Sequence, residues 1–328
     1  MIRVLKRFIY LFLSVVTLII GCKESRNKKP VKQNVHEKLL KKTPLIGGNY
    51  VSEGYRQRAE GYDWVAVSVK KLDSEKISIK VRSRADKKKP TCTFDATAYK
   101  QDDTIYTTVV NGKTVIFDIH QDSLSIRTEE AGEDGILYFY CSGGATLAGN
   151  YRKIKGVIDA TQVDKTDFSK VLSLQGIGFN VSTIKKEGQH VLTVSPFGLE
   201  IDNSPQTYIS KGQVVKAMVE DMNSDGSPEL LVISKSEDTS KKGRVYGFSV
   251  NNRKSMSPVH FLPTDENQRI NQGYQGHDEF ALVETKLLQR FPIFDAAGQP
   301  SGKTRQVSYE LKDGEALRKF EIVTINEY

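Results

Sequence analysis

The strongest constraint on the fold is the alternation of apolar and polar residues along the chain after residue 44. In "KISIKVR" at 76–82, isoleucine and valine alternate with lysine, serine and arginine, and this period of two is typical of a strand with one buried face. Asn111-Gly112 stands between two runs rich in β-branched residues, which is the pattern of a tight hairpin. We therefore predict an all-β protein.

The chain after residue 43 is long enough for two hydrophobic cores, since roughly 285 residues exceed the size that one core usually serves. We predict a small β-barrel or sandwich over 44–154, followed by an antiparallel β-sandwich over 156–328. The runs "GGNY" and "AGNY" bracket the first domain, and whether its end strands are neighbours stays open. "GILYFYC" at 135–141 is predicted as a strand, while "DFSKVLSL" at 167–174 could be a short helix.

The amino terminus has the layout of a bacterial export signal. Three basic residues precede an apolar run over 8–20, which is typical of a signal peptide and too short to span a membrane permanently. The run "IIGC" resembles a lipoprotein box, which implies that residues 1–21 are removed and that Cys22 is acylated. Because Lys23 follows in place of aspartate, the resemblance implies an outer-membrane anchor, on the periplasmic or the surface face.

The net charge of +8 belongs to the amino-terminal segments. Residues 1–21 carry +3 and residues 23–43 carry +6, so the remainder is close to neutral at −1. We expect the lysine-rich segment 22–43 to be a disordered tether that can contact anionic head groups. A folded part without net positive charge argues against nucleic acid as a partner.

The cysteines fit an exported protein. Once Cys22 carries lipid, Cys92 and Cys141 remain, and an even number in an oxidising compartment predicts a disulfide. Closing a loop of about 50 residues would stabilise the fold by roughly 4 kcal/mol.

The segment 54–65, "GYRQRAEGYDWV", combines aromatic and polar residues. Tyr55, Tyr62 and Trp64 could line the mouth of a ligand site, or they could form strand core and turn. Both interpretations stay open.

Six runs in the second domain occur in the order found in one known family. They are "LSLQGIGFNVS" (172–182), "LTVSPFGLEIDNSP" (192–205), "VEDMNSDGSPELLV" (219–232), "FSVNNRKSMSPVHFLP" (248–263), "GYQGHDEFALVE" (273–284) and "RFPIFDAAGQPSGKTRQVSYEL" (290–311). Through these runs, residues 156–328 resemble the PliI family, the periplasmic inhibitors of invertebrate-type lysozyme. The resemblance implies an exported β-sandwich, often dimeric, that blocks the active-site cleft of a lysozyme. We expect no cofactor, with calcium as the one alternative.

The inhibitory loop of the family has no direct counterpart here. Family members insert a Ser-Gly-x-Tyr loop, whereas the equivalent place, just before Gly243, reads Thr-Ser-Lys-Lys. A glycosidase cleft offers two carboxylates, and a lysine gains more from them in a dry cleft than in water. We therefore expect lysine or arginine to replace the tyrosine, with a solvated basic hairpin tip as the alternative. The candidate residues are Ser240, Lys241, Lys242, Gly243 and Arg244.

The run His277-Asp278-Glu279 has the composition of an active site. In a strand His277 and Glu279 would face one side, and Asp278 the other. Acid–base catalysis by this pair would need a nucleophile or a metal-bound water nearby, and the sequence contains no Gly-x-Ser-x-Gly or His-Glu-x-x-His motif. We interpret the run as a turn whose polar residues fix the backbone.

A second polar run could hold calcium. Asp221, Asn223 and Asp225 alternate before Gly226, and Glu229 follows, which resembles the start of a calcium-binding loop. The same composition also forms a metal-free turn in which Asn and Asp cap backbone groups.

These observations favour a membrane-anchored lipoprotein that binds and inhibits a lysozyme and is not an enzyme. One alternative is a binding module of the same fold that recognises another protein, a glycan or a calcium-bridged ligand. A second alternative is an envelope hydrolase that uses His277 and Asp278.

Overall fold

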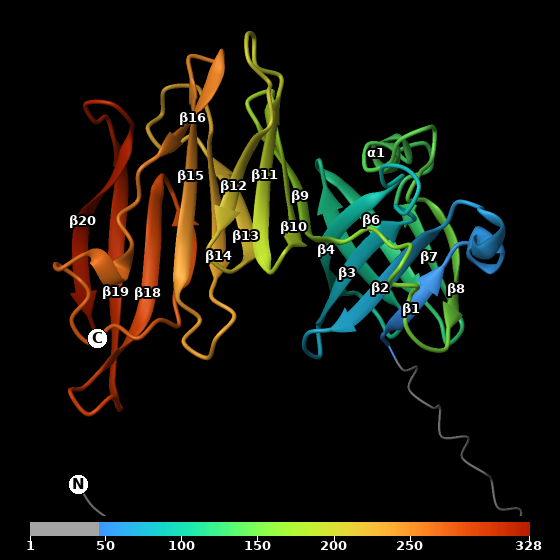
Figure 1. Cartoon of the computed structure of the whole chain (residues 1–328), viewed down its shortest axis with the longest axis horizontal. Helices are drawn as coiled ribbons and strands as arrows, with labels where there is room; N and C mark the ends of the chain where they lie inside the picture. Colours follow the sequence, from blue (N-terminus) through green and yellow to red (C-terminus); the bar gives the residue numbers. More distant parts are fainter. Residues whose placement is uncertain (1–45) are drawn as a thin grey trace, which may run out of the picture. The chain divides into compact units, whose positions relative to one another are not determined.

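The computed structural model describes residues 46–328 of the chain (Figure 1). The expected signal peptide, the acylated Cys22 and the lysine-rich tether lie outside the described residues. Nearly all the regular secondary structure of the described part is strand, as the alternating sequence pattern predicts, so the all-β class is confirmed. Its helical elements are short: the 3-10 helices η1 (Glu53–Glu60) and η2 (Thr264–Glu266), and the α-helix α1 (Gly135–Tyr138).

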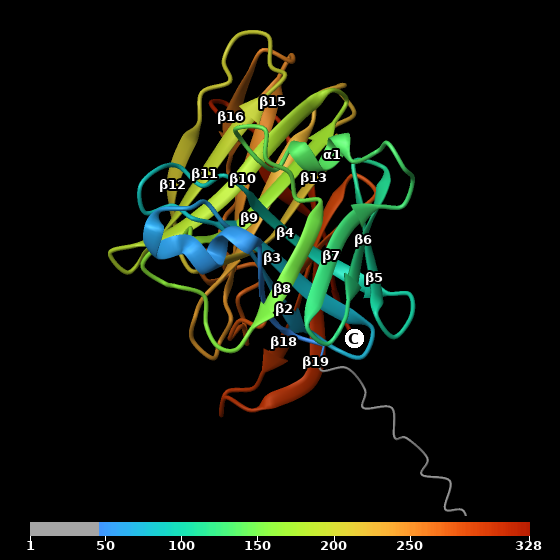
Figure 2. The same cartoon turned by 90° about the vertical axis from the view of Figure 1, so that its right-hand side faces the viewer.

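Eight antiparallel strands form a closed barrel in the first half of the chain (Figure 2). They are β1 (Gly48–Val51), β2 (Val65–Lys71), β3 (Lys76–Ser83), β4 (Thr93–Lys100), β5 (Ile105–Val110), β6 (Lys113–Ile119), β7 (Ser123–Thr128) and β8 (Gly149–Ile154). The barrel closes because β1 pairs with β8, with Tyr50 opposite Lys153. The two end strands of the domain are therefore neighbours, and the barrel leaves no open sheet edge.

The barrel follows from its local sequence. The β5–β6 hairpin turns at Asn111 and Gly112, both with positive φ, which a two-residue turn of this type requires. The alternate residues Ile77, Ile79 and Val81 of β3 are fully buried in the barrel core.

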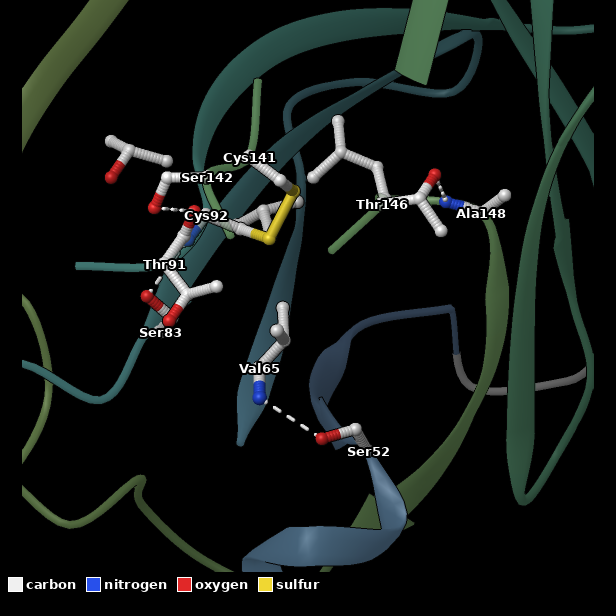
Figure 3. Close-up of a disulfide and its surroundings, with 12 residues drawn as sticks. Ser52, Val65, Ser83, Thr91, Cys92, Cys141, Ser142, Thr146 and Ala148 are labelled. Atoms are coloured by element: carbon white, nitrogen blue, oxygen red, sulfur yellow. Dashed lines mark hydrogen bonds between the residues drawn. A yellow bond between two sulfur atoms is a disulfide. The ribbon is translucent and has the colours of Figure 1, made fainter. Parts of the chain in front are cut away.

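The disulfide between Cys92 and Cys141 is present, as predicted. The cysteines lie on an isolated antiparallel bridge (Figure 3). However, the prediction of a strand over 135–141 is wrong, because residues 135–138 form α1. A strand would have buried both Leu137 and Phe139; instead Leu137 is buried and Phe139 is half-exposed.

Three four-stranded antiparallel sheets form the rest of the chain, each a simple meander. The first sheet contains β9 (Thr166–Leu174), β10 (Ile177–Lys186), β11 (Gln189–Phe197) and β12 (Gln206–Ser210). The second contains β13 (Gln213–Glu220), β14 (Glu229–Lys235), β15 (Gly243–Asn251) and β16 (Ser255–Val259). The third contains β17 (Glu279–Val283), β18 (Lys286–Phe294), β19 (Pro300–Lys312) and β20 (Lys319–Glu327).

The second sheet is buried on both faces, so the sandwich has three layers where we expected two. On β14, Leu230 and Val232 belong to the core shared with the first sheet, whereas Leu231 and Ile233 belong to the core shared with the third. This double burial explains why "ELLVIS" is apolar without alternation. The strands run antiparallel throughout, as predicted.

The segment 167–174, which could have been a short helix, is a strand. It lies within β9 and pairs with β10 along its length, with Val171 opposite Asn180. The long-range pairing overrides the weak helical pattern of the isolated segment.

Candidate functional site

The loop 236–242 joins β14 to β15 and is held by its own hydrogen bonds. The backbone N–H of Ser236 donates to the carbonyl of Lys242 at 2.9 Å, and the N–H of Lys242 donates back to the Ser236 hydroxyl at 2.8 Å. Asp238 accepts from the N–H and the hydroxyl of Ser240, and these bonds lower the pKa of Asp238. The loop therefore has a defined conformation before it meets any partner.

The candidate residues in this loop differ in how freely they can reach a partner. Lys241 is exposed at the tip, where its amine donates to the carbonyl of Glu237 at 3.1 Å. The amine of Lys242 is 4.0 Å from Asp265 and its side chain is 40 % exposed. Arg244 is mostly buried and its guanidinium is paired with Asp265 at 2.8 Å. Arg244 is thus held by an ion pair within the protein, whereas the side chains of Lys241 and Lys242 are more exposed.

A tight turn supports the loop from one side. The N–H of His277 donates to the carbonyl of Ser240 at 2.6 Å. Gly276 has φ +99°, and a Cβ atom there would lie 2.1 Å from the Ser240 carbonyl oxygen. Only glycine allows this close approach, so the position of Ser240 depends on Gly276.

Asp278 supports the end of the loop from inside the protein. Its side chain is fully buried, and one carboxylate oxygen accepts from the Gly243 N–H at 2.6 Å and from the Tyr274 hydroxyl at 2.5 Å. The other oxygen accepts from the amide of Gln289 at 2.6 Å. Burial raises the pKa of Asp278, against the effect of these hydrogen bonds.

The run His277-Asp278-Glu279 follows the alternation expected from the sequence, with His277 and Glu279 exposed and Asp278 buried. His277 precedes β17 and has φ +60°. The imidazole stacks near Phe294 at 6.2 Å, while both oxygens of Asp278 are engaged by other groups. Asp278 has no exposed surface at which it could meet a substrate.

A groove of about 430 Å³ runs beside the loop, between Gln189–His190 and Ser236–Glu237. The His190 side chain is almost fully buried, and its Nε2 lies 3.2 Å from Glu237. Glu237 also pairs with Lys185 at 3.0 Å. These contacts fix the start of the loop to the first sheet.

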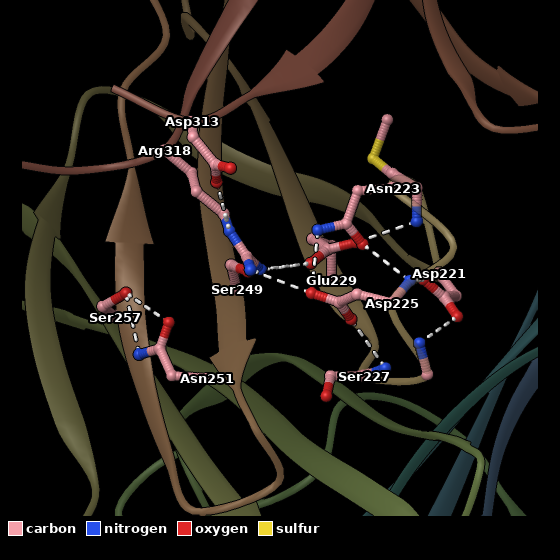
Figure 4. Close-up of polar contacts among 12 residues, drawn as sticks. Asp221, Asn223, Asp225, Ser227, Glu229, Ser249, Asn251, Ser257, Asp313 and Arg318 are labelled. Atoms are coloured by element: carbon pink, nitrogen blue, oxygen red, sulfur yellow. Dashed lines mark hydrogen bonds and ion pairs between the residues drawn. The ribbon is translucent and has the colours of Figure 1, made fainter. Parts of the chain in front are cut away.

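The run 221–229 forms a polar turn between β13 and β14 (Figure 4). The Asp221 carboxylate accepts from the N–H of Asp225 at 3.0 Å and of Gly226 at 2.9 Å. Asn223 donates to Asp225 at 2.9 Å. This is the capped turn that the composition allows without metal.

Arg318 places a positive charge in the same cluster (Figure 4). Its guanidinium contacts Asp225 at 2.8 Å and Glu229 at 3.4 Å. Glu229 is fully buried and also accepts from Met222 N–H and the Ser249 hydroxyl. Burial raises the pKa of Glu229 to about 7.

Within 46–328, no group of three or more His, Cys, Asp and Glu residues is arranged to hold a metal ion. The sequence-predicted ligands Asp221, Asn223, Asp225 and Glu229 do come together, but they bind backbone groups and Arg318. Calcium binding by this turn stays a prediction, and calorimetry with calcium after chelation tests it. Also within 46–328, no helix has the length and apolarity needed to cross a membrane.

No protein-family model matches the chain, and no curated protein matches it. Among solved structures, the chain is similar to an endo-1,4-beta-xylanase from Bacteroides thetaiotaomicron VPI-5482, at 11 % identity and a TM-score of 0.31, covering 85 % of this chain and 95 % of that one. It is also similar to a thermostable family-43 glycoside hydrolase, at 10 % identity and a TM-score of 0.33, covering 85 % and 93 %.

Both of these proteins are named as enzymes, so we withdraw the expectation that the chain is not an enzyme. At TM-scores of 0.31 and 0.33 the likeness carries no argument for a particular fold or activity of this chain.

Proposed function

We propose that this protein binds and inhibits a lysozyme of the invertebrate type by inserting the loop 236–242 into the active-site cleft. The proposal starts from the six runs over 172–311 that resemble the PliI family in order. By this resemblance, the inhibitory loop of the family is equivalent to the segment just before Gly243, which is the loop 236–242.

The observation that carries the proposal is the fixed conformation of the loop. The loop makes hydrogen bonds within itself. The N–H of His277 donates to Ser240 in the loop, and Asp278 accepts from the N–H of Gly243 at the end of the loop. A segment that is already ordered loses less conformational entropy when it enters a cleft. This is the property that an inserted inhibitory loop needs.

The charge of the loop supports the same partner. Lys241 is exposed and Lys242 is half-exposed, so both can approach the two carboxylates of a glycosidase cleft. Arg244 supports the loop through Asp265 and is not proposed to enter the cleft. Ser240 and Gly243 supply backbone contacts that set the loop's position.

The membrane anchor is part of the proposal. Acylated Cys22 would hold the protein at the outer membrane, and the lysine-rich segment 23–43 would separate the folded part from the lipid. This arrangement would keep the inhibitor beside the cell wall that a lysozyme attacks. Mass spectrometry of the membrane-extracted protein tests acylation at Cys22.

A second candidate is a binding module that recognises a partner without inhibiting a lysozyme. Two observations favour it: the Ser-Gly-x-Tyr sequence is missing, and Arg244 is engaged with Asp265. Binding and inhibition are therefore measured separately, with invertebrate-, chicken- and goose-type lysozymes. Binding without loss of lysozyme activity would favour this candidate.

A further inference from the structure

One end of the barrel carries a cavity that the proposed function does not use. At this end β1 is followed by the connection 52–64, β3 by 84–92 and β7 by 129–148. Because neighbouring antiparallel strands reverse there, these three connections lie at the same end of the barrel, and they line an open cavity of about 390 Å³. The mouths of β-barrels are common places for small-molecule sites.

Two walls of this cavity are fixed by the fold (Figure 3). On one side the N–H of Val65 donates to the Ser52 hydroxyl at 2.9 Å. On the other side the disulfide lies next to Thr91 and Ser142, and the N–H of Ser142 donates to the carbonyl of Thr91 at 2.8 Å. The Ser142 hydroxyl also donates to the Thr91 carbonyl at 3.4 Å, so Thr91 and Ser142 together form one fixed wall.

Positive charge outweighs negative charge around the cavity. Lys88, Lys89 and Asp63 all line it. Lys88 pairs with Asp63, and Lys89 is exposed and makes no ion pair or hydrogen bond with any residue in 46–328. Two lysines and one aspartate thus line the cavity.

The remaining lining of the cavity includes apolar side chains. Trp64, Val65 and Ala145 contribute apolar surface. Tyr55 and Trp64 pack edge to face at 5.0 Å and are buried, whereas Tyr62 is exposed. Of the three aromatic residues that could have lined a ligand mouth, only Trp64 lines this cavity.

We propose that this cavity binds the oxyanion group, carboxylate or phosphate, of a small polar molecule. Lys89 and Lys88 neutralise the charge, and the hydroxyls of Thr91 and Ser142 donate hydrogen bonds to the oxyanion. To do so, the Ser142 hydroxyl gives up its long bond of 3.4 Å to the Thr91 carbonyl. Lys88 stays paired with Asp63, so Lys89 supplies the uncompensated positive charge. The site is independent of the loop 236–242 and of lysozyme binding.

Calorimetry on the full chain with three probes tests the proposal: inorganic phosphate, acetate and glucuronate. Heat with phosphate alone identifies a phosphate site, and heat with acetate or glucuronate identifies a carboxylate site. Replacing Lys88→Ala together with Lys89→Ala should weaken binding by at least about tenfold, since one charge-assisted hydrogen bond is worth that much.

The matched control is Lys70→Ala together with Lys71→Ala, which removes the same charge from exposed positions on β2. This control should keep the affinity of the unmodified chain. Ser142→Ala should weaken binding less than the double lysine variant does. Absence of heat with all three probes, or equal weakening in both double variants, would overturn the proposal.

Discussion

The buried carboxylate of Asp278 accepts a hydrogen bond from the backbone N–H of Gly243 at 2.6 Å. Gly243 begins β15 directly after the loop 236–242, and Asp278 precedes β17 of the next sheet. A Cβ atom on Gly243 would lie 2.8 Å from Cβ of Asp278, so the contact needs a glycine there. The loop proposed to bind lysozyme is thus positioned by a residue of another sheet.

Asp278→Ala should lower the free energy of unfolding by about 3 kcal/mol or more, because three buried donors lose their acceptor. Urea denaturation measures the change. Glu279→Ala, an exposed neighbour, should change it by about 0.5 kcal/mol or less. Equal effects in the two variants would contradict a supporting role for Asp278.

Gly276→Ala should displace the loop, because the new methyl group meets the Ser240 carbonyl at 2.1 Å. Gly302→Ala is the matched control: Gly302 also has positive φ, but nothing lies within 4 Å of the added Cβ. We expect Gly276→Ala to cost about 2 kcal/mol more than the control and to speed amide hydrogen exchange in the loop. Unchanged exchange at Ser240 would show that the turn does not hold the loop.

Glu229 makes stability depend on pH. Its pKa is raised from 4.5 to about 7 in the folded protein, so the folded state binds the proton more readily than the unfolded state between these values. The stability from this group is complete below pH 4.5 and falls as pH rises to about 7, by about 3 kcal/mol at most. Urea denaturation at pH 5 and pH 7 should show a smaller difference in Glu229→Gln than in the unmodified chain; the same difference in both would refute the assignment.

The disulfide should stabilise the barrel strongly. It closes a loop with a sequence separation of 49, so replacing both cysteines with serine should lower the free energy of unfolding by about 4 kcal/mol. Denaturation with and without reductant gives the comparison, since reductant should affect the unmodified chain and leave the double variant unchanged. A loss below about 1 kcal/mol would contradict the loop-entropy estimate.

Local pattern was sufficient to predict the all-β class, but it left a barrel and a sandwich as alternatives for residues 44–154. The period of two in β3 and the Asn111-Gly112 turn are short-range signals, and both hold in the structure. The third layer was visible only indirectly, in the unbroken apolar run of β14, which is typical of a strand buried on both faces. The segment 135–138 was wrongly predicted as a strand, because its apolar residues fit a strand as well as a helical turn.

The hydrogen bonds and ion pairs that hold the candidate site join residues that are far apart in the sequence. Gly243 and Asp278 are 35 residues apart, and Arg318 reaches Asp225 across 93 residues. Composition identified Asp278 as part of a turn, but no spacing rule names Gly243 as its partner. Arg318 was missed altogether, because a lone arginine before a strand carries no signal of its partners.

The most direct test is the inhibition of invertebrate-type lysozyme by the full chain, compared with a variant that carries Lys241→Ala and Lys242→Ala. The control variant carries Lys186→Ala and Lys303→Ala, at exposed positions outside the loop. We predict that the unmodified chain and the control inhibit alike, and that the loop variant loses inhibition by at least about tenfold. Inhibition by the loop variant equal to that of the control would contradict the account, as would no inhibition by the unmodified chain.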